Sequence, residues 1–296
     1  MFYVKTVYST NGVDIVDTID GVSELVSLDL AYKVGNIVGL EYNNVRSVSL
    51  EELIEMQLLT YRTVKKEIPF KIEGTTLVKC TKDVEEVEVP YGITTIGTYA
   101  FKVCSELRKV VLPLSVHSIE MAAFYRCDNL TDIEIPDSVD SLGKSIFMDC
   151  VALQNIKLPS KLRKIPAGMF FGCFSLETVQ LPCMLNTIGT SAFGDCFALK
   201  EIHFPESLVS IQDGAFSYCK SLQEVKLEHN VEFIGAAAFR HCESLQHLVI
   251  DATVQTRIGA GAFVQCVNLQ DVRLGKISLM GSTKKDVFSG CAFLKK

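Results

Sequence analysis

The chain has 296 residues, of which 48% are hydrophobic, and a formal net charge of −6. Its acidic and basic residues are interspersed, which excludes the basic face expected of a nucleic-acid-binding protein. The N-terminus lacks the pattern of a signal peptide, and no apolar run is long enough to span a membrane. We therefore expect a cytoplasmic protein as the chain stands, and a surface or secreted protein if a leader has been removed.

Residues 1–69 contain strand and helix signals without any repeat. Residues 2–8 and 13–16 alternate as strands do, and Asn11-Gly12 between them predicts a hairpin turn. Further signals predict a short helix at 23–32, a strand at 35–40, and a helix that a capping box opens at Ser49 and that runs to residue 59. We interpret this segment as a small α+β N-terminal domain, with a role in capping the rest of the chain or in recognising a partner.

Residues 70–296 are built on a period of 23 residues. Cysteines mark the period, a phenylalanine lies three residues before each of them, and a leucine lies three residues after. The cysteines are Cys104, Cys127, Cys150, Cys173, Cys196, Cys219 and Cys242, followed with small insertions by Cys266 and Cys291. Self-similarity at such a period predicts a solenoid, in which each coil packs only on its neighbours.

One coil, residues 127–150, shows the predicted local structure. Residues 131–135 alternate polar and apolar, which predicts a half-buried strand that Pro136 ends. Val139 and Leu142 form a second inward-facing pair on a short extended segment, and residues 145–150 fit a helical turn. Nine strands of the first kind recur, stacked as one parallel sheet, so the predicted class is an α/β solenoid preceded by the small α+β domain.

The repeat resembles a known family. Residues 188–196 and 211–219 carry the pattern I-x-x-x-A-F-x-x-C, followed by a leucine three residues later and an alternating strand. This pattern resembles the leucine-rich repeats of the BspA type, also called the Treponema pallidum type, over residues 70–296. The resemblance implies a leucine-rich-repeat solenoid used in protein–protein interaction, often on the surface of gut bacteria or protozoa.

The cysteine ladder is interpreted as structural. Eleven cysteines is an odd number, and they follow the repeat instead of pairing locally, so we expect reduced, buried thiols acting as small apolar groups. A single cysteine per coil cannot supply the four ligands of a zinc site. We expect no metal, no cofactor and no catalytic residues.

Two outward-facing surfaces are candidates for partner binding. The first is an apolar ridge on the helical-turn side, where large residues replace the polar ones of other coils: Tyr125, Met148, Phe171, Val151, Phe174 and Phe197. The alternative is that these side chains fold down against one another. The second surface is the polar strand face, represented by Glu88, Glu134, Lys157, His203, Lys226 and Arg273. Its alternative is simple solvation.

The predicted function is a non-enzymatic protein–protein interaction module with a rigid repeat surface. Two alternatives stay open: a cell-surface adhesin or host-matrix-binding protein, and an enzyme activity in the N-terminal domain. The last coil begins near residue 288 without a following cap, so self-association through the C-terminal face is a further expectation.

Overall fold

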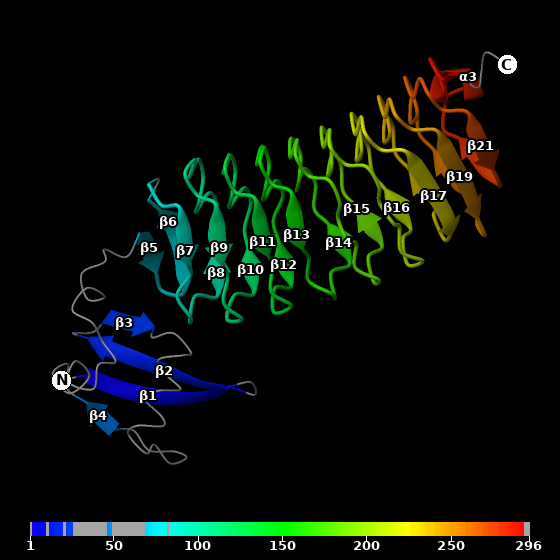
Figure 1. Cartoon of the computed structure of the whole chain (residues 1–296). Coiled ribbons are helices and arrows are strands. Elements are labelled where there is room, and N and C mark those ends of the chain that lie inside the picture. Colours follow the sequence, from blue (N-terminus) through cyan, green and yellow to red (C-terminus); the bar gives the residue numbers. More distant parts are fainter. Residues whose placement is uncertain are drawn as a thin grey trace. The chain divides into compact units, whose positions relative to one another are not determined.

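The computed structural model describes residues 2–9, 12–19, 22–25, 46–48, 69–81 and 83–292. The chain divides into two compact units, Met1–Ile68 and Pro69–Lys296. The strands of both units are drawn as arrows in Figure 1.

The first unit contains an antiparallel sheet in the order β3-β2-β1-β4. Strands β1 (Phe2–Ser9) and β2 (Gly12–Ile19) form the predicted hairpin, which closes at the pair Ser9 and Gly12. Strand β3 (Val22–Leu25) pairs with the end of β2, and β4 (Arg46–Val48) pairs with the start of β1.

One helix prediction in this unit is wrong at its start. Residues 23–25, expected to open a helix at 23–32, belong to β3, because pairing with β2 extends the hairpin and tertiary pairing overrides local propensity. The predicted strand at 35–40 and helix at 49–59 lie outside the described residues.

The second unit is a stack of coils whose strands form parallel ladders (Figure 1). It opens with an antiparallel hairpin of β5 (Phe70–Glu73) and β6 (Thr76–Cys80). The strand face then consists of β7 (Glu86–Glu88), β9 (Lys109–Val111), β11 (Asp132–Glu134), β13 (Asn155–Lys157), β17 (Glu224–His229), β19 (His247–Ala252) and β21 (Asp271–Leu274).

The short extended segments of the coils form two further ladders, one that ends at β12 and one that begins at β14. Their strands are β8 (Thr95–Ile96), β10 (Ser118–Ile119), β12 (Ser141–Leu142), β14 (Lys164–Ile165), β15 (Thr187–Ile188), β16 (Ser210–Ile211), β18 (Phe233–Ile234), β20 (Thr256–Ile258) and β22 (Ile277–Leu279). From β8 to β18, each strand points one buried apolar residue inward, except β12, where Leu142 is half-buried.

Proline explains the lengths of the strand-face strands. Coils with a proline after the strand have strands of three residues, whereas β17, β19 and β21 lack that proline and have six, six and four residues. Proline cannot donate to a continuing ladder.

Seven of the nine predicted segments are strands. The other two, around Val179 and Ile202, share only the isolated bridge between Thr178 and Glu201, and nothing in the structure explains the difference.

The core is a column of stacked phenylalanines beside a column of thiols. Eight successive pairs of ladder phenylalanines, from Phe101 to Phe288, stack with ring centroids 4.8–5.8 Å apart. Each ladder cysteine from Cys127 to Cys291 donates its S–H to the carbonyl of the ladder phenylalanine one coil earlier, at 3.0–3.3 Å. The thiols therefore act as donors as well as apolar groups, a role that the sequence pattern does not reveal.

The predicted helical turn of each coil is a pair of tight turns instead. In the coils from Phe101 to Phe263, the residues two before and two after the ladder phenylalanine have φ between +50° and +74°, for example Ser145 and Asp149, which stops a helix from forming. The turn backbone instead bonds to the next coil, as Phe147 N–H does to the Met169 carbonyl at 2.9 Å. The α/β prediction is thus corrected to a parallel β-solenoid: within residues 69–81 and 83–292 the one α-helix is the four-residue α3 (Lys284–Val287).

Candidate interaction surface

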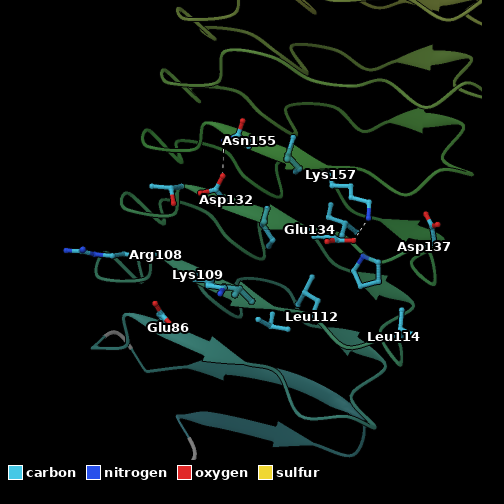
Figure 2. A pocket seen from close by; sticks show the side chains of 17 residues that line it. Glu86, Arg108, Lys109, Leu112, Leu114, Asp132, Glu134, Asp137, Asn155 and Lys157 are labelled. Carbon is cyan, nitrogen blue, oxygen red and sulfur yellow. Dashed lines mark hydrogen bonds and ion pairs between the residues drawn. The ribbon is translucent and has the colours of Figure 1, made fainter. Parts of the chain in front are cut away.

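A groove of about 930 Å³ lies over the first four strand-face strands. Its floor and walls come from β7, β9, β11 and β13 and from the residues just before and after them, as Figure 2 shows. Parallel pairing in register places Glu86, Lys109, Asp132 and Asn155 in one outward row, and Val111, Glu134 and Lys157 in the next.

Apolar side chains are exposed in this groove. Val111 is 43% exposed and Leu114 is 60% exposed, the largest exposure among the large hydrophobic residues of the described structure. Leu114 follows Pro113, and the same position in the other coils with this proline holds Tyr91, Asp137, Ser160, Cys183 and Glu206. Leu114 is not among the predicted site residues, which lie in the strand and turn columns. The available signal was an aliphatic side chain after the coil proline, where the five other coils with this proline have none.

Most charges at the far wall of the groove are already paired within the protein. Lys157 Nζ forms an ion pair with Glu134, and Asn155 Nδ2 donates to Asp132 Oδ1 at 2.8 Å (Figure 2). The hydrogen bond to the Glu134 carboxylate raises the pKa of Lys157. The Ser160 backbone N–H, whose nitrogen lies 2.7 Å from an oxygen of the Asp137 carboxylate, lowers the pKa of that carboxyl. These pairs hold the wall in one charged arrangement around the apolar residues.

The other strand-face candidates are spread along the sheet. Glu88 lies in register with Val111, next to the groove, and Glu134 and Lys157 line it. His203 lies beside the isolated bridge, Lys226 pairs with Glu228 at 3.2 Å, and Arg273 is on β21. The structure therefore brings three of the six candidates together and leaves the other three apart from them.

The apolar ridge is partly folded down. Of its six residues only Phe174 is exposed, at 42%, and the other five are half-buried. Phe174 stacks on Phe197 with ring centroids 4.8 Å apart, and Tyr125 meets Tyr99 edge-on at 6.5 Å. Phe171 lies across Gly194, where even a Cβ atom would come within 2.8 Å of its ring.

The described residues show no arrangement of the kind that metal sites use. Within them there is no group of three or more histidine, cysteine or acidic residues placed to hold a metal ion. All eleven cysteines are free, and only Cys183 is exposed. Burial is the first cause of the raised pKa of the Cys173, Cys196 and Cys219 thiols, so these thiols stay protonated and are poor nucleophiles. None of the helices in the described part of the chain has the length and apolarity to cross a membrane.

Comparisons with solved structures agree with this fold. A leucine-rich repeat protein from Eubacterium ventriosum ATCC 27560 is 26% identical with a TM-score of 0.54, over 58% of this chain and 47% of that one. This chain thus spans about half of that protein. The T. pallidum leucine rich repeat protein is 26% identical with a TM-score of 0.50, over 74% and 90% of the two chains. A leucine-rich repeat protein from Bacteroides ovatus ATCC 8483, 21% identical with a TM-score of 0.53 over 76% and 72%, shares the fold.

The sequence comparisons identify the repeat itself. No curated protein sequence matches this chain. A family model described as the BspA type leucine rich repeat region, in six copies, matches residues 71–200 and 186–296. These ranges contain the phenylalanine and cysteine ladders of the core and the strands that line the groove. The chain belongs to the BspA-type leucine-rich-repeat family.

Proposed function

We propose that this protein is a non-enzymatic interaction module that binds a protein partner in the groove over β7–β13. The observation that carries the proposal is the exposure of Val111 and Leu114 in a hollow where Glu134 pairs with Lys157 and Asp132 accepts a hydrogen bond from Asn155. Exposed apolar residues with a polar rim are typical of protein interaction sites. Leucine-rich-repeat proteins are typically interaction or cell-surface proteins, which supports the same conclusion.

The rigidity of the groove favours binding. Its strands are fixed by parallel pairing on both sides of β9 and β11, and their inward residues are part of the core. A preformed surface loses little conformational freedom on association, so more of the contact energy appears as affinity. A partner with an apolar side chain for Val111 and Leu114, flanked by groups of both charges, fits this surface best.

Affinity capture from native cells tests the proposal. Immobilised wild-type protein is compared with the double variant Val111→Asp and Leu114→Asp, and with the matched control Met121→Asp and Val267→Asp. The control residues are 45% and 42% exposed and do not line the groove. We expect a partner captured by the wild type and the control to be reduced at least about tenfold with the groove variant. Equal capture by all three proteins would place the contact elsewhere.

Self-association through the C-terminal coil is a second candidate. In β19 the inward residues Leu248 and Ile250 are buried, whereas Val272 and Leu274 in β21 are half-buried. Strands β21 and β22 are each the last strand of their sheet within the described residues. A second copy that covers this end would bury them. Light scattering over a concentration series tests this. We expect the wild type to form a dimer that the variant Leu274→Lys disrupts, and a monomeric wild type would contradict self-association.

The remaining proposals concern the N-terminal unit and the location of the protein. We propose that residues 1–69 form an α+β domain that caps the solenoid or recognises a partner; an enzyme activity there is the less favoured alternative.

Eleven free thiols favour a reducing compartment, hence the cytoplasm. A membrane-impermeant label that marks the protein on intact cells would instead support the alternative of a surface adhesin.

A further inference from the structure

One step of the solenoid lacks the strand pairing that joins the other coils. This step, which we call the seam, lies between residues 141–157 and residues 164–180. On the strand face, β13 is the last strand of its sheet, and among the described residues no backbone hydrogen bond joins it to residues 177–181. The short segments are also unpaired at the seam, because one ladder ends at β12 and the next begins at β14 (Figure 1). Every other pair of neighbouring coils from β7 to β22 is joined by strand-face pairing, short-segment pairing or both.

Pro166 explains the break between the ladders of short segments. In each of the other coils, the residue that follows the short strand donates its N–H to the coil before, as Gly189 does to the Ile165 carbonyl at 2.9 Å. Pro166 occupies this position in its coil, and proline has no N–H to donate. Leu142, whose carbonyl would accept that bond, is half-buried, whereas Ile165 in the next coil is fully buried. The proline therefore leaves β12 and β14 without the bond that closes the other steps.

The core is also most widely spaced at the seam. The ring centroids of Phe147 and Phe170 are 5.8 Å apart, whereas the other seven stacked pairs of ladder phenylalanines lie at 4.8–5.3 Å. The turn side, by contrast, is fully connected. The N–H groups of Ser145, Phe147 and Asp149 donate to the next coil at 2.7–2.9 Å, and Cys173 donates its S–H to the Phe147 carbonyl at 3.2 Å. The hydrogen bonds that hold the seam therefore lie on its turn side.

We propose that the seam is a hinge, at which the coils before it and the coils after it bend relative to each other about the hydrogen bonds of the turn side. Each coil of a repeat protein contacts only its neighbours, so the stiffness of the stack is set step by step. Opening any other step on the strand side would break the hydrogen bonds of at least one ladder, whereas opening the seam breaks none of them. Hinges concentrate a conformational change in a few positions in this way.

The hinge goes beyond the proposed function and does not depend on it. The groove ends at β13, which forms one edge of the seam. The bend at the seam therefore sets how near the coils that follow come to a partner in the groove.

Double electron–electron resonance between two spin labels measures the bending. The labels are attached to Glu86→Cys and Asp271→Cys, two exposed positions near the ends of the strand face. At the spacing of neighbouring strands these positions are roughly 40 Å apart. Cys183→Ser is the background for labelling, because Cys183 is exposed and the ten other cysteines are buried. We expect a broad distribution of distances in this background, since the seam bends.

Two variants restore the missing donor. Pro166→Gly and Pro166→Gln supply the N–H group that Gly189 and Gln212 supply in the following coils. Each is expected to narrow the distance distribution about twofold, because the restored bond stiffens the hinge. Pro113→Gly, which removes a proline from a coil outside the seam, is the control and is expected to leave the distribution broad. A distribution that is equally narrow with and without Pro166, or one that neither variant narrows, would overturn the proposal.

Discussion

Single residues in the turns carry backbone strain that glycine would relieve. Position 237 holds an alanine with φ +53°, whereas the equivalent residues Gly168, Gly214 and Gly261 are glycines with φ of +61° to +64°. A left-handed conformation costs a residue with a Cβ atom about 1–2 kcal/mol. The turns keep this conformation because their N–H groups bond to the next coil, as Ala237 does to the Ala260 carbonyl at 3.0 Å.

Ala237→Gly is therefore expected to stabilise the protein by about 0.5–1 kcal/mol. The neighbouring Ala238 is fully buried and lacks a positive φ, so Ala238→Gly is the matched control and is expected to destabilise by about 1 kcal/mol. Urea unfolding followed by circular dichroism measures both. If both variants lost a similar amount of stability, glycine would not relieve the strain at position 237.

The thiols differ sharply in accessibility. Ten cysteines are buried, and burial, together with neighbouring ladder thiols, raises the pKa of most of them, while Cys183 is exposed. Because the thiolate is the reactive form, iodoacetamide is expected to modify Cys183 alone in the native protein, even at mildly alkaline pH. Peptide mass spectrometry after labelling identifies the site. Native labelling of Cys150 or Cys196 would contradict the buried ladder.

Asp149 and Asp195 give a pH-dependent prediction. The pKa of each carboxyl in the folded protein is raised above its ordinary value of 3.8. At a pH above the raised pKa, the ionised carboxyl therefore destabilises the fold. This destabilisation disappears as the pH falls to 3.8 and below, where the carboxyl is protonated in both the folded and the unfolded protein. The Asp149→Asn and Asp195→Asn variant is therefore expected to melt higher at pH 7, by on the order of 1 °C, with no gain near pH ~3.5. An equal gain at both pH values would rule out ionisation as the cause.

At the scale of one coil, stability depends on the stacked phenylalanines. Phe193 is fully buried between Phe170 and Phe216, with centroids 5.1 Å away on either side. Phe193→Ala is expected to cost about 3–5 kcal/mol in unfolding experiments. Phe174→Ala, which removes a ring that is 42% exposed, is the control and is expected to cost about 1 kcal/mol. Similar costs for both would mean that the ladder is not the main source of stability.

The elements could be predicted from the sequence where a period fixed them. Columns of phenylalanine, cysteine and isoleucine each have one inward position per coil, so the parallel register and the core could be derived directly. The prediction of a helical turn was wrong because the spacing of Phe147 and Cys150 suits two tight turns as well as a helix. Only the positive φ of Ser145 and Asp149 distinguishes the two structures. Side chains such as Ser145 give no signal of that conformation.

At the scale of the whole molecule, the candidate surfaces could be predicted only in part. The sequence predicts which columns face outward. It does not predict the packing of Phe171 over Gly194 or the ion pair of Glu134 with Lys157, because both depend on contacts between coils. The groove depends on Leu114, one residue outside the predicted columns. Burial of individual outward side chains is set by neighbours 22–24 residues away, as the bonds of Ser115, Asn155 and Ser207 illustrate, and a single column does not reveal them.

Site-specific photo-crosslinking can show whether the groove over β7–β13 contacts the partner. A photoreactive phenylalanine analogue is placed at Leu114 in one protein and at Val267 in another, since both positions are exposed. After illumination with the captured partner, we expect a covalent adduct from position 114 and none from position 267. An adduct from position 267 with none from position 114 would contradict it.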